Sequence, residues 1–280
     1  VRAMWYYTAL VAVLFCLLMH LESLSIIPHS IDPIEDLYLI NIFNRFGYLL
    51  VGAILIRHMD AHLGDGAPPL RSFTISFVAP MVPGPVDLEA TTLRAGKSVT
   101  QVQVMARQEG QVVATMLGSL GHGRESSIRV PGPEAPRWKA PQDCFKLPYM
   151  EGRSPTFLRF FDMRIAGGNM IFSGSKEPDF HGYMRFDEPG QTQDAATLAC
   201  LVDTWPAGVL PMLSKPAPAS SLTWTMELLE DPRELAPVDF WQYQVITDSF
   251  ADGYGQCQAT VWDDRGRPVA LSRQTVVVFG

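Results

Sequence analysis

The feature that most constrains this sequence is an internal repeat, in which the second half restates the first. Three short segments recur at offsets that grow slowly from 152 to 156 residues. The pairs are Gly84–Leu88 with Ala236–Phe240, Gln101–Gln103 with Gln256–Gln258, and Gly110–Ala114 with Gly266–Ala270. Such a drift is expected when loops lengthen between two copies of one unit. The chain is therefore expected to fold as two similar units, and in this register Gln274 corresponds to Gly118.

Each copy is predicted to contain one helix followed by strands. The helices are expected at Phe46–Leu63, with an apolar face that includes Ala53, Ile54 and Ile56 and with Gly64 as its C-cap, and at Ala195–Thr204. Alternating patterns predict the strands Arg71–Val78, Val86–Arg94, Ser98–Gln108, Val112–Leu120, Phe157–Ile165, His181–Phe186, Ser221–Leu228 and Pro268–Phe279. Helices followed by antiparallel strands indicate an α+β fold.

Changes in composition along the sequence divide the chain into four parts. Residues 1–45 form an atypical apolar N-terminal segment, 46–120 the first unit, 121–155 a linker rich in Pro and Gly, and 156–280 the second unit. The linker breaks the periodic pattern because it carries six prolines between Pro131 and Pro155. The second unit is expected to carry the site.

The composition excludes several classes of protein. With 47% apolar and 18% charged residues the chain is globular, and a net charge of −7 argues against a nucleic-acid partner. The four cysteines are far apart and form no CxxC pair, which is typical of reduced thiols in a cytoplasmic protein. We therefore expect a cytoplasmic location.

The run Met4–Leu21 is apolar except for Thr8 and His20, and its length is at the lower limit for crossing a membrane. As an anchor, with Arg2 before it and acidic residues after it, the run would place the rest of the chain outside the cytoplasm. We favour a core or docking segment. Membrane contact through residues 4–21, with membrane association of the protein, is the alternative.

Two histidines, His58 and His62, stand four residues apart at the polar end of the first helix. This spacing could make one facet of a metal site. A zinc site needs three or four ligands, and no third ligand is evident in the sequence. No metal is therefore expected.

A single carboxylate, Asp203, falls next to the apolar face of the second helix. Burying a charge there is costly, so the carboxylate is expected to be hydrogen-bonded or to have a functional role. Pro206 predicts that the helix ends just after this residue. In the terminal strand Gln274 interrupts residues that favour a strand, whereas the first copy has Gly118. The asymmetry points to a site in which Asp203 and Gln274 converge on one water.

The chain resembles the acyl-CoA thioesterase II type of thioesterase over roughly residues 46–280. The matching stretches are Phe46–Tyr48, Phe77–Leu88, Phe172–Ser175, Leu198–Thr204 and Val269–Gln274. The resemblance implies a double hotdog fold, no cofactor, and water-mediated hydrolysis of acyl-CoA. It assigns catalysis to Asp203, Gln274 and Ser221, where the family usually has Thr. Ser221 and Thr223 are two residues apart in the predicted strand and are expected on the same face. A small shift in the strand register would therefore give the hydroxyl role to Thr223.

The expected function is hydrolysis of an acyl-CoA or other acyl thioester to free acid and CoA, a reaction of lipid metabolism. The protein is expected to assemble as a homo-oligomer. No GxSxG elbow or Ser-His-Asp order is present, so no covalent nucleophile is expected. The alternative is a double hotdog that binds an acyl group or acyl-CoA without catalysis.

Overall fold

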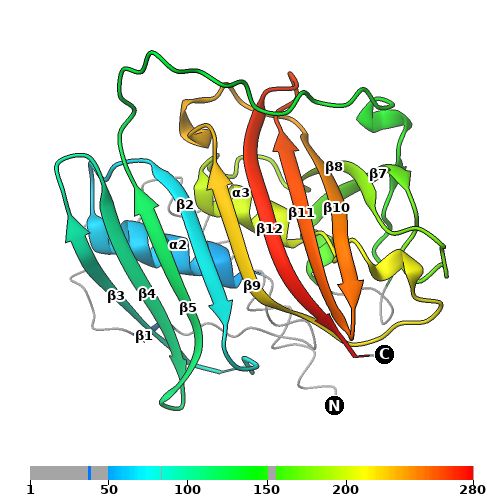
Figure 1. Ribbon diagram of the computed structural model, residues 1–280, viewed down its shortest axis with the longest axis horizontal. Coiled ribbons are helices and arrows are strands. Elements are labelled where there is room, and N and C mark those ends of the chain that lie inside the picture. The colour runs from blue at the N-terminus through cyan, green and yellow to red at the C-terminus, as the bar shows by residue number, and fades with distance from the viewer. Residues whose placement is uncertain (1–36, 39–49, 83, 151–155, 280) are drawn as a thin grey trace.

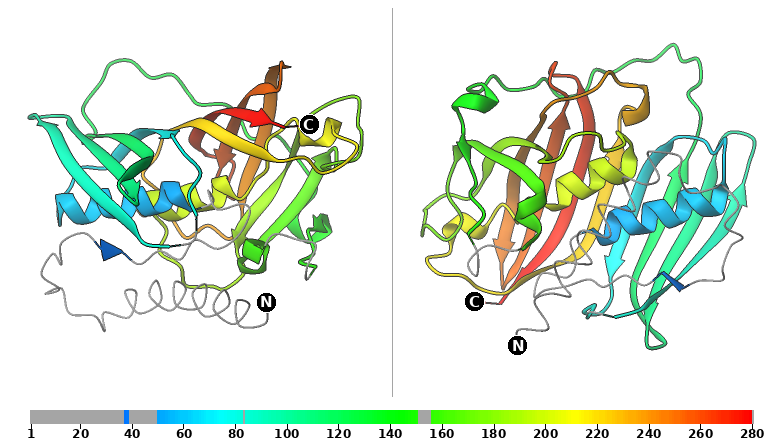
Figure 2. Two further views of the ribbon diagram at one scale, coloured as in Figure 1. Left: turned by 90° about the horizontal axis from the view of Figure 1, so that it is seen from below. Right: turned by 180° about the vertical axis from the view of Figure 1, so that it is seen from behind.

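The computed structural model describes residues 37–38, 50–82, 84–150 and 156–279. The expected apolar segment Met4–Leu21 and the start of the first predicted helix lie outside the described residues. Within the described residues, the strands form one antiparallel sheet in the order β1-β3-β4-β5-β2-β9-β12-β11-β10-β8-β7-β6. Both α-helices lie against the same face of this sheet (Figures 1 and 2).

The first unit is one helix packed on four long strands, with a short strand at the outer edge. Its elements are β1 (Leu37–Tyr38), α2 (Val51–Leu63), β2 (Leu70–Phe77), β3 (Val86–Ala95), β4 (Thr100–Gln108) and β5 (Gln111–Leu120). Gly64 ends α2 with φ of 72° and donates its N–H to Asp60, as predicted. The buried face includes Ala53 and Ile56 and also Leu55 and Met59, which the prediction left out.

The second unit repeats this plan and adds strands at its outer edge. Its elements are β6 (Phe145–Lys146), β7 (Phe161–Gly168), β8 (Phe180–Phe186), α3 (Ala195–Asp203), β9 (Ala219–Leu228), β10 (Trp241–Ala251), β11 (Tyr254–Trp262) and β12 (Pro268–Val278). The strand expected at Phe157–Ile165 was placed too early. Thr156–Phe160 is a 3₁₀ turn, and pairing with β8 begins only at Phe161.

The stretch after Gly121 passes along the end of the sheet on the face away from the helices (Figures 1 and 2). It is held there because the Trp262 indole donates to the Pro133 carbonyl at 2.8 Å. Trp138 then stacks on His181 with ring centroids 4.4 Å apart. The stretch is not wholly irregular, since β6 within it pairs with β7.

Strand pairing confirms the repeat and fixes its register. Val102 pairs with Gly118 in the first unit, and Cys257 pairs with Gln274 in the second. Gly118 and Gln274 are therefore equivalent, as predicted. Shifts in the pairing also recur at equivalent places, between Thr92 and Arg94 in β3 and between Thr247 and Ser249 in β10. β-Bulges are specific local features, so their repetition is strong support for a duplicated unit.

One of the three sequence matches is out of register. Leu88 pairs with Ala106, and its structural counterpart Tyr243 pairs with Val261, which gives an offset of 155 residues. The sequence comparison had instead matched Leu88 with Phe240 at an offset of 152. That match reflects similar residues just before the strand and not an equivalent position in the sheet.

The two units meet where β2 pairs with β9. Thr74 and Thr225 are directly opposite, and their hydroxyls are hydrogen-bonded at 3.0 Å. On the helix side, the equivalent residues Phe73 and Trp224 pack edge to face with centroids 5.0 Å apart. Gly52 lets α2 lie against this indole, because a Cβ there would be 2.6 Å from the Trp224 ring. The core is thus continuous across the two units.

The helices run antiparallel to one another. Arg57 in α2 pairs with Asp194 at 2.7 Å, and Asp194 is also the N-cap of α3. The Asp194 carboxylate accepts the Thr197 N–H, and the Thr197 hydroxyl accepts the Asp194 N–H, which satisfies donors at the start of the helix. The other end of α3, at Asp203, consequently lies beside the start of α2.

Candidate active site

Asp203 is the last residue of α3, and the helix ends there as Pro206 predicted. Its Oδ2 atom accepts a hydrogen bond from the Leu50 N–H at 3.2 Å. Burial raises the pKa of Asp203 to about 7, although the Leu50 hydrogen bond opposes this rise. A carboxylate with a pKa near neutrality is well matched to accepting a proton from water.

The donor to Asp203 comes from the first unit. Leu50 is the N-cap of α2 and has φ of 82°, in the left-handed region that is costly for a residue other than glycine. The first N–H groups of a helix have no acceptor within it and carry a partial positive charge. The start of α2 therefore presents hydrogen-bond donors beside Asp203.

Gln274 lies in β12, directly opposite Cys257 in β11 and Trp224 in β9. Residues opposite one another in an antiparallel sheet share a face. Trp224 is fully buried beneath α2, so Gln274 is on the helix side of the sheet. Its side chain is partly buried.

A bulge separates the two candidate hydroxyls. Thr223 pairs with Thr275, but the next pair is Ser221 with Val276, so Leu222 is the extra residue. Ser221 therefore shares a face with Val276, which is buried and two residues from Gln274. Thr223 is exposed and precedes Trp224 on the opposite face. Ser221 thus lies on the face of the sheet that carries Gln274, and Thr223 does not.

The first unit shows how the three positions relate in space. Met59 is the ninth residue of α2 as Asp203 is of α3, and the strand registers match Leu70 with Ser221 and Gly118 with Gln274. Met59 and Leu70 both lie beside Gly118. A Cβ on Gly118 would lie 2.5 Å from the Met59 sulfur and 3.6 Å from Leu70 Cδ1. The three equivalent positions of the second unit are occupied by Asp203, Ser221 and Gln274.

The counterpart of the site is therefore filled in the first unit. Met59 is fully buried, and its sulfur lies where the side chain of residue 118 would begin. All three first-unit residues are apolar or lack a side chain. The asymmetry that the sequence showed at one position extends to the whole constellation. The described residues show no direct hydrogen bond among Asp203, Ser221 and Gln274.

Two further polar groups lie on the helix side of this unit and were missed from the sequence. Burial raises the pKa of the Tyr243 hydroxyl, and the charges of Cys257 and Asp203 raise it further. Burial likewise raises the pKa of the Cys257 thiol, against hydrogen bonds from Thr247 and from the backbone of Gly208 and Val209. Both groups remain neutral near pH 7, so the Cys257 thiol is a poor nucleophile.

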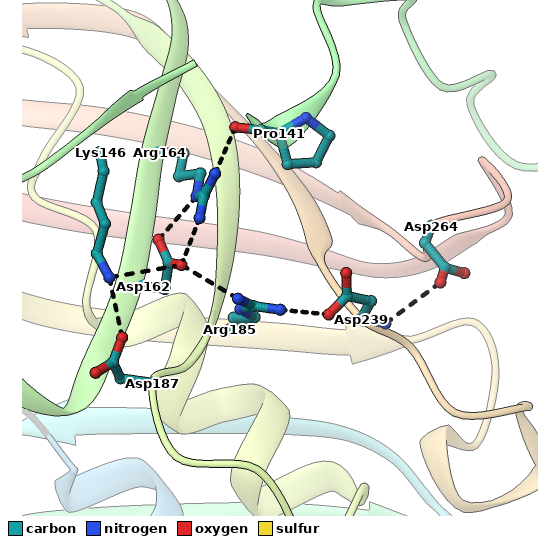
Figure 3. Close-up of polar contacts among 8 residues, drawn as sticks. All are labelled: Pro141, Lys146, Asp162, Arg164, Arg185, Asp187, Asp239 and Asp264. Atoms are coloured by element: carbon teal, nitrogen blue, oxygen red, sulfur yellow. Dashed lines mark hydrogen bonds and ion pairs between the residues drawn. The ribbon is translucent and has the colours of Figure 1, made fainter. Parts of the chain in front are cut away.

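A separate cluster of charges lies at the outer edge of the second unit (Figure 3). At its centre the buried Asp162 carboxylate accepts two hydrogen bonds from Arg164, at 2.9 and 2.8 Å. Arg185 and Lys146 contact the same carboxylate, and they also pair with Asp239 and Asp187, respectively. The cluster is balanced in charge and joins β6, β7 and β8, so its role is structural.

Within the residues that the structure describes, no three His, Cys, Asp or Glu side chains gather as a metal site. His62 instead lies 3.0 Å from the Thr92 hydroxyl. No described helix is both long and apolar enough to cross a membrane.

The comparisons with known proteins cover both units. Residues 50–121 match the acyl-CoA thioesterase N-terminal domain, and residues 141–278 match the acyl-CoA thioesterase C-terminal domain. A search of curated proteins returned no match.

Solved structures share the fold. A conserved hot dog protein of unknown function from Alicyclobacillus acidocaldarius is 24% identical, with a TM-score of 0.73, over 82% of this chain and 85% of that one. Acyl-CoA thioesterase II TesB2 from Mycobacterium marinum is 18% identical, with a TM-score of 0.62, over 82% of this chain and 87% of that one. The α+β double hotdog fold is thereby confirmed. With both domains matched in tandem, the chain belongs to the acyl-CoA thioesterase family.

Proposed function

We propose that this protein hydrolyses acyl-CoA thioesters to the free acid and CoA, using a water activated by Asp203, Gln274 and Ser221. The observation that carries the proposal is that Gly118 and the two residues packed beside it, Met59 and Leu70, are replaced by three polar residues in the second unit. Buried polar groups are costly, so a cluster confined to one of two equivalent positions favours a functional role.

In the proposed mechanism, the water oxygen attacks the thioester carbonyl carbon while Asp203 takes a proton from the water. The Gln274 amide and the Ser221 hydroxyl hold the water or the substrate carbonyl in place. Holding the reacting groups in position removes much of the entropic barrier to the reaction. The pKa of about 7 suits Asp203 to this proton transfer.

The attack places a negative charge on the former carbonyl oxygen. The N–H groups at the start of α2 are the proposed donors to this oxyanion, because Leu50 already brings that helix end to Asp203. Collapse of the intermediate breaks the carbon–sulfur bond. The proton on Asp203 then passes to the departing CoA sulfur, which returns the site to its starting state.

The competing function is binding of an acyl group or acyl-CoA without hydrolysis. The experiment that separates the two is a panel of acyl-CoA substrates of increasing chain length, with free CoA release and binding measured on the same protein. Turnover with at least one substrate supports the proposal. Binding without release of CoA from any substrate would favour the binding function. A cytoplasmic location, a homo-oligomeric state and a part in lipid metabolism stay predictions.

A further inference from the structure

Trp205 follows the proposed base by two residues and is held by contacts to two aromatic rings and a sulfur atom. Its ring stacks between two others, with centroids 4.8 Å from Tyr243 at 7° and 5.7 Å from Phe180 at 19°. Its indole N–H points at the Met184 sulfur, 2.9 Å away. Trp205 is almost fully buried, so the chain that leaves α3 is anchored directly in the sheet.

The backbone between the base and this ring is also fixed. The Thr204 hydroxyl donates to the Leu201 carbonyl at 2.6 Å, and the Trp205 N–H donates to the Val202 carbonyl at 3.3 Å. These bonds close the last turn of α3 around Asp203. Because the Leu50 N–H also donates to its Oδ2 atom, Asp203 is constrained both through its backbone and through its carboxylate.

In the part of the first unit that the structure describes, there is no such anchor. Its helix continues past Met59, the counterpart of Asp203, to Leu63. The residue equivalent to Trp205 is Ala61, which is exposed, and the residue equivalent to Tyr243 is Leu88. Among the described residues of the two copies, this stack therefore exists only beside the proposed site, as expected of a feature that serves the site and not the fold.

We propose that Trp205 is a positioning residue, which fixes the end of α3 and hence the direction of the Asp203 carboxylate. This inference rests on the proposed function. The ring does not touch the reacting atoms but acts through the residue that does. A misplacement of about 1 Å in a catalytic group lowers the rate by up to ~10²-fold.

The test compares Trp205→Leu with Trp138→Leu as a matched control. Trp138 also packs against three rings, those of His181, Tyr183 and Trp262. Tyr183 and Trp262 are opposite Gln242, one residue from Tyr243, so Trp138 lies on the other face of the sheet. Trp205→Leu should lower kcat by ~10–100-fold with little change in KM, because binding is less sensitive than chemistry to the direction of the base. Trp138→Leu should lose stability without this loss in kcat, and Trp205→Phe should retain most of the rate.

A second measurement does not depend on turnover. The Asp203 carboxyl is titrated by carbon-13 NMR, with its resonance assigned by its absence in Asp203→Asn. Loosening the anchor admits water, so its pKa should fall by about one unit or more in Trp205→Leu and stay unchanged in Trp138→Leu. The titratable groups nearby, Tyr243 in β10 and Cys257 in β11, are neutral over this range.

Tyr243→Leu provides a variant with the same purpose if Trp205→Leu does not fold. It removes one ring of the stack and installs the residue that the first unit carries. Wild-type kcat together with an unchanged Asp203 titration in Trp205→Leu or Tyr243→Leu would overturn the inference. An inactive wild type whose Asp203 pKa still falls in these variants would refute the proposed function and leave the positioning role standing.

Discussion

The backbone N–H of Leu50 donates a hydrogen bond to Oδ2 of Asp203 although 153 residues separate them in the chain. This bond joins the start of the first unit's helix to the end of the second unit's helix. The carboxyl proposed as the base is therefore held by both copies of the repeat. The proposal expects one site in the duplicated chain, because the reciprocal contact would need an acid where the first unit has Met59.

The pKa of Asp203 predicts the pH dependence of hydrolysis. Its carboxyl must be ionised to accept a proton, and burial raises its pKa to about 7. The value of kcat/KM should thus rise about tenfold per pH unit below this pKa and level off above it. Initial rates between pH 5 and pH 9 with one acyl-CoA check this. A flat profile from pH 5 to pH 8 would show that no group with this pKa takes part.

Gly118→Ala should affect stability but not catalysis. A new Cβ would lie 2.5 Å from the buried sulfur of Met59, so the core must shift. Overpacking of this kind costs about 1–3 kcal/mol of unfolding free energy. Urea unfolding should show this loss while kcat stays within about threefold of wild type, since the proposed site is in the other unit.

The double variant Met59→Ala/Gly118→Ala is the control for this prediction. It removes the colliding atoms, so the second substitution should cost less than it does alone. A large drop in kcat in folded Gly118→Ala would mean that the first-unit position also takes part in catalysis.

Asp162→Asn should destabilise the outer edge of the second unit. Its carboxylate is almost fully buried and forms ion pairs with Arg164, Arg185 and Lys146. Burial would raise the pKa of Asp162, but the Arg164 hydrogen bond and the three positive charges outweigh it, and the pKa is lowered. Removing one partner of a fully buried ion pair lowers the free energy of unfolding by about 3–5 kcal/mol. The loss should be smaller here, because the cations are partly exposed.

The sign of this shift sets the pH range of the effect. A depressed pKa contributes stability that is present above the ordinary Asp pKa and is lost as the pH falls through the folded value. The difference between wild type and Asp162→Asn should therefore shrink in acid. Asp187→Asn, at the exposed end of the same cluster, is the control and should change stability by at most about 0.5 kcal/mol. Equal losses in both variants at pH 7 would contradict a central role for Asp162.

Several strands of both copies could be predicted from their alternating patterns, but the long strands β10 and β11 were not predicted. Between the predicted strands Ser98–Gln108 and Val112–Leu120, Glu109 and Gly110 both have positive φ, as a tight hairpin turn requires. The short strand β6 was not predicted, since two residues carry no periodicity and its pairing depends on β7. Bulges such as the one at Leu222 also leave no pattern in the sequence, yet this bulge decides which hydroxyl faces the helices.

The candidate site could be predicted from the sequence only where the two copies of the repeat were aligned in the correct register. The terminal strand was in register, so the contrast between Gln274 and Gly118 was visible. The alignment of the two halves of the sequence matched Leu88 with Phe240, which precedes β10. The structure instead matches Leu88 with Tyr243, so the sequence did not reveal this polar difference. The role of Met59 in filling the first-unit position is a matter of packing between a helix and a strand, which no local pattern predicts.

The most direct test of the central claim is the rate of acyl-CoA hydrolysis by Asp203→Asn. Removal of a general base should lower kcat by about 10²–10⁴-fold. Gln274→Ala should lose less, about 10–10³-fold, because it removes one positioning or oxyanion contact. Because burial raises the pKa of Asp203, ionising it destabilises the fold as pH rises towards 7, so Asp203→Asn should melt at or above the wild-type temperature at pH 8. A folded Asp203→Asn with wild-type activity would contradict the account.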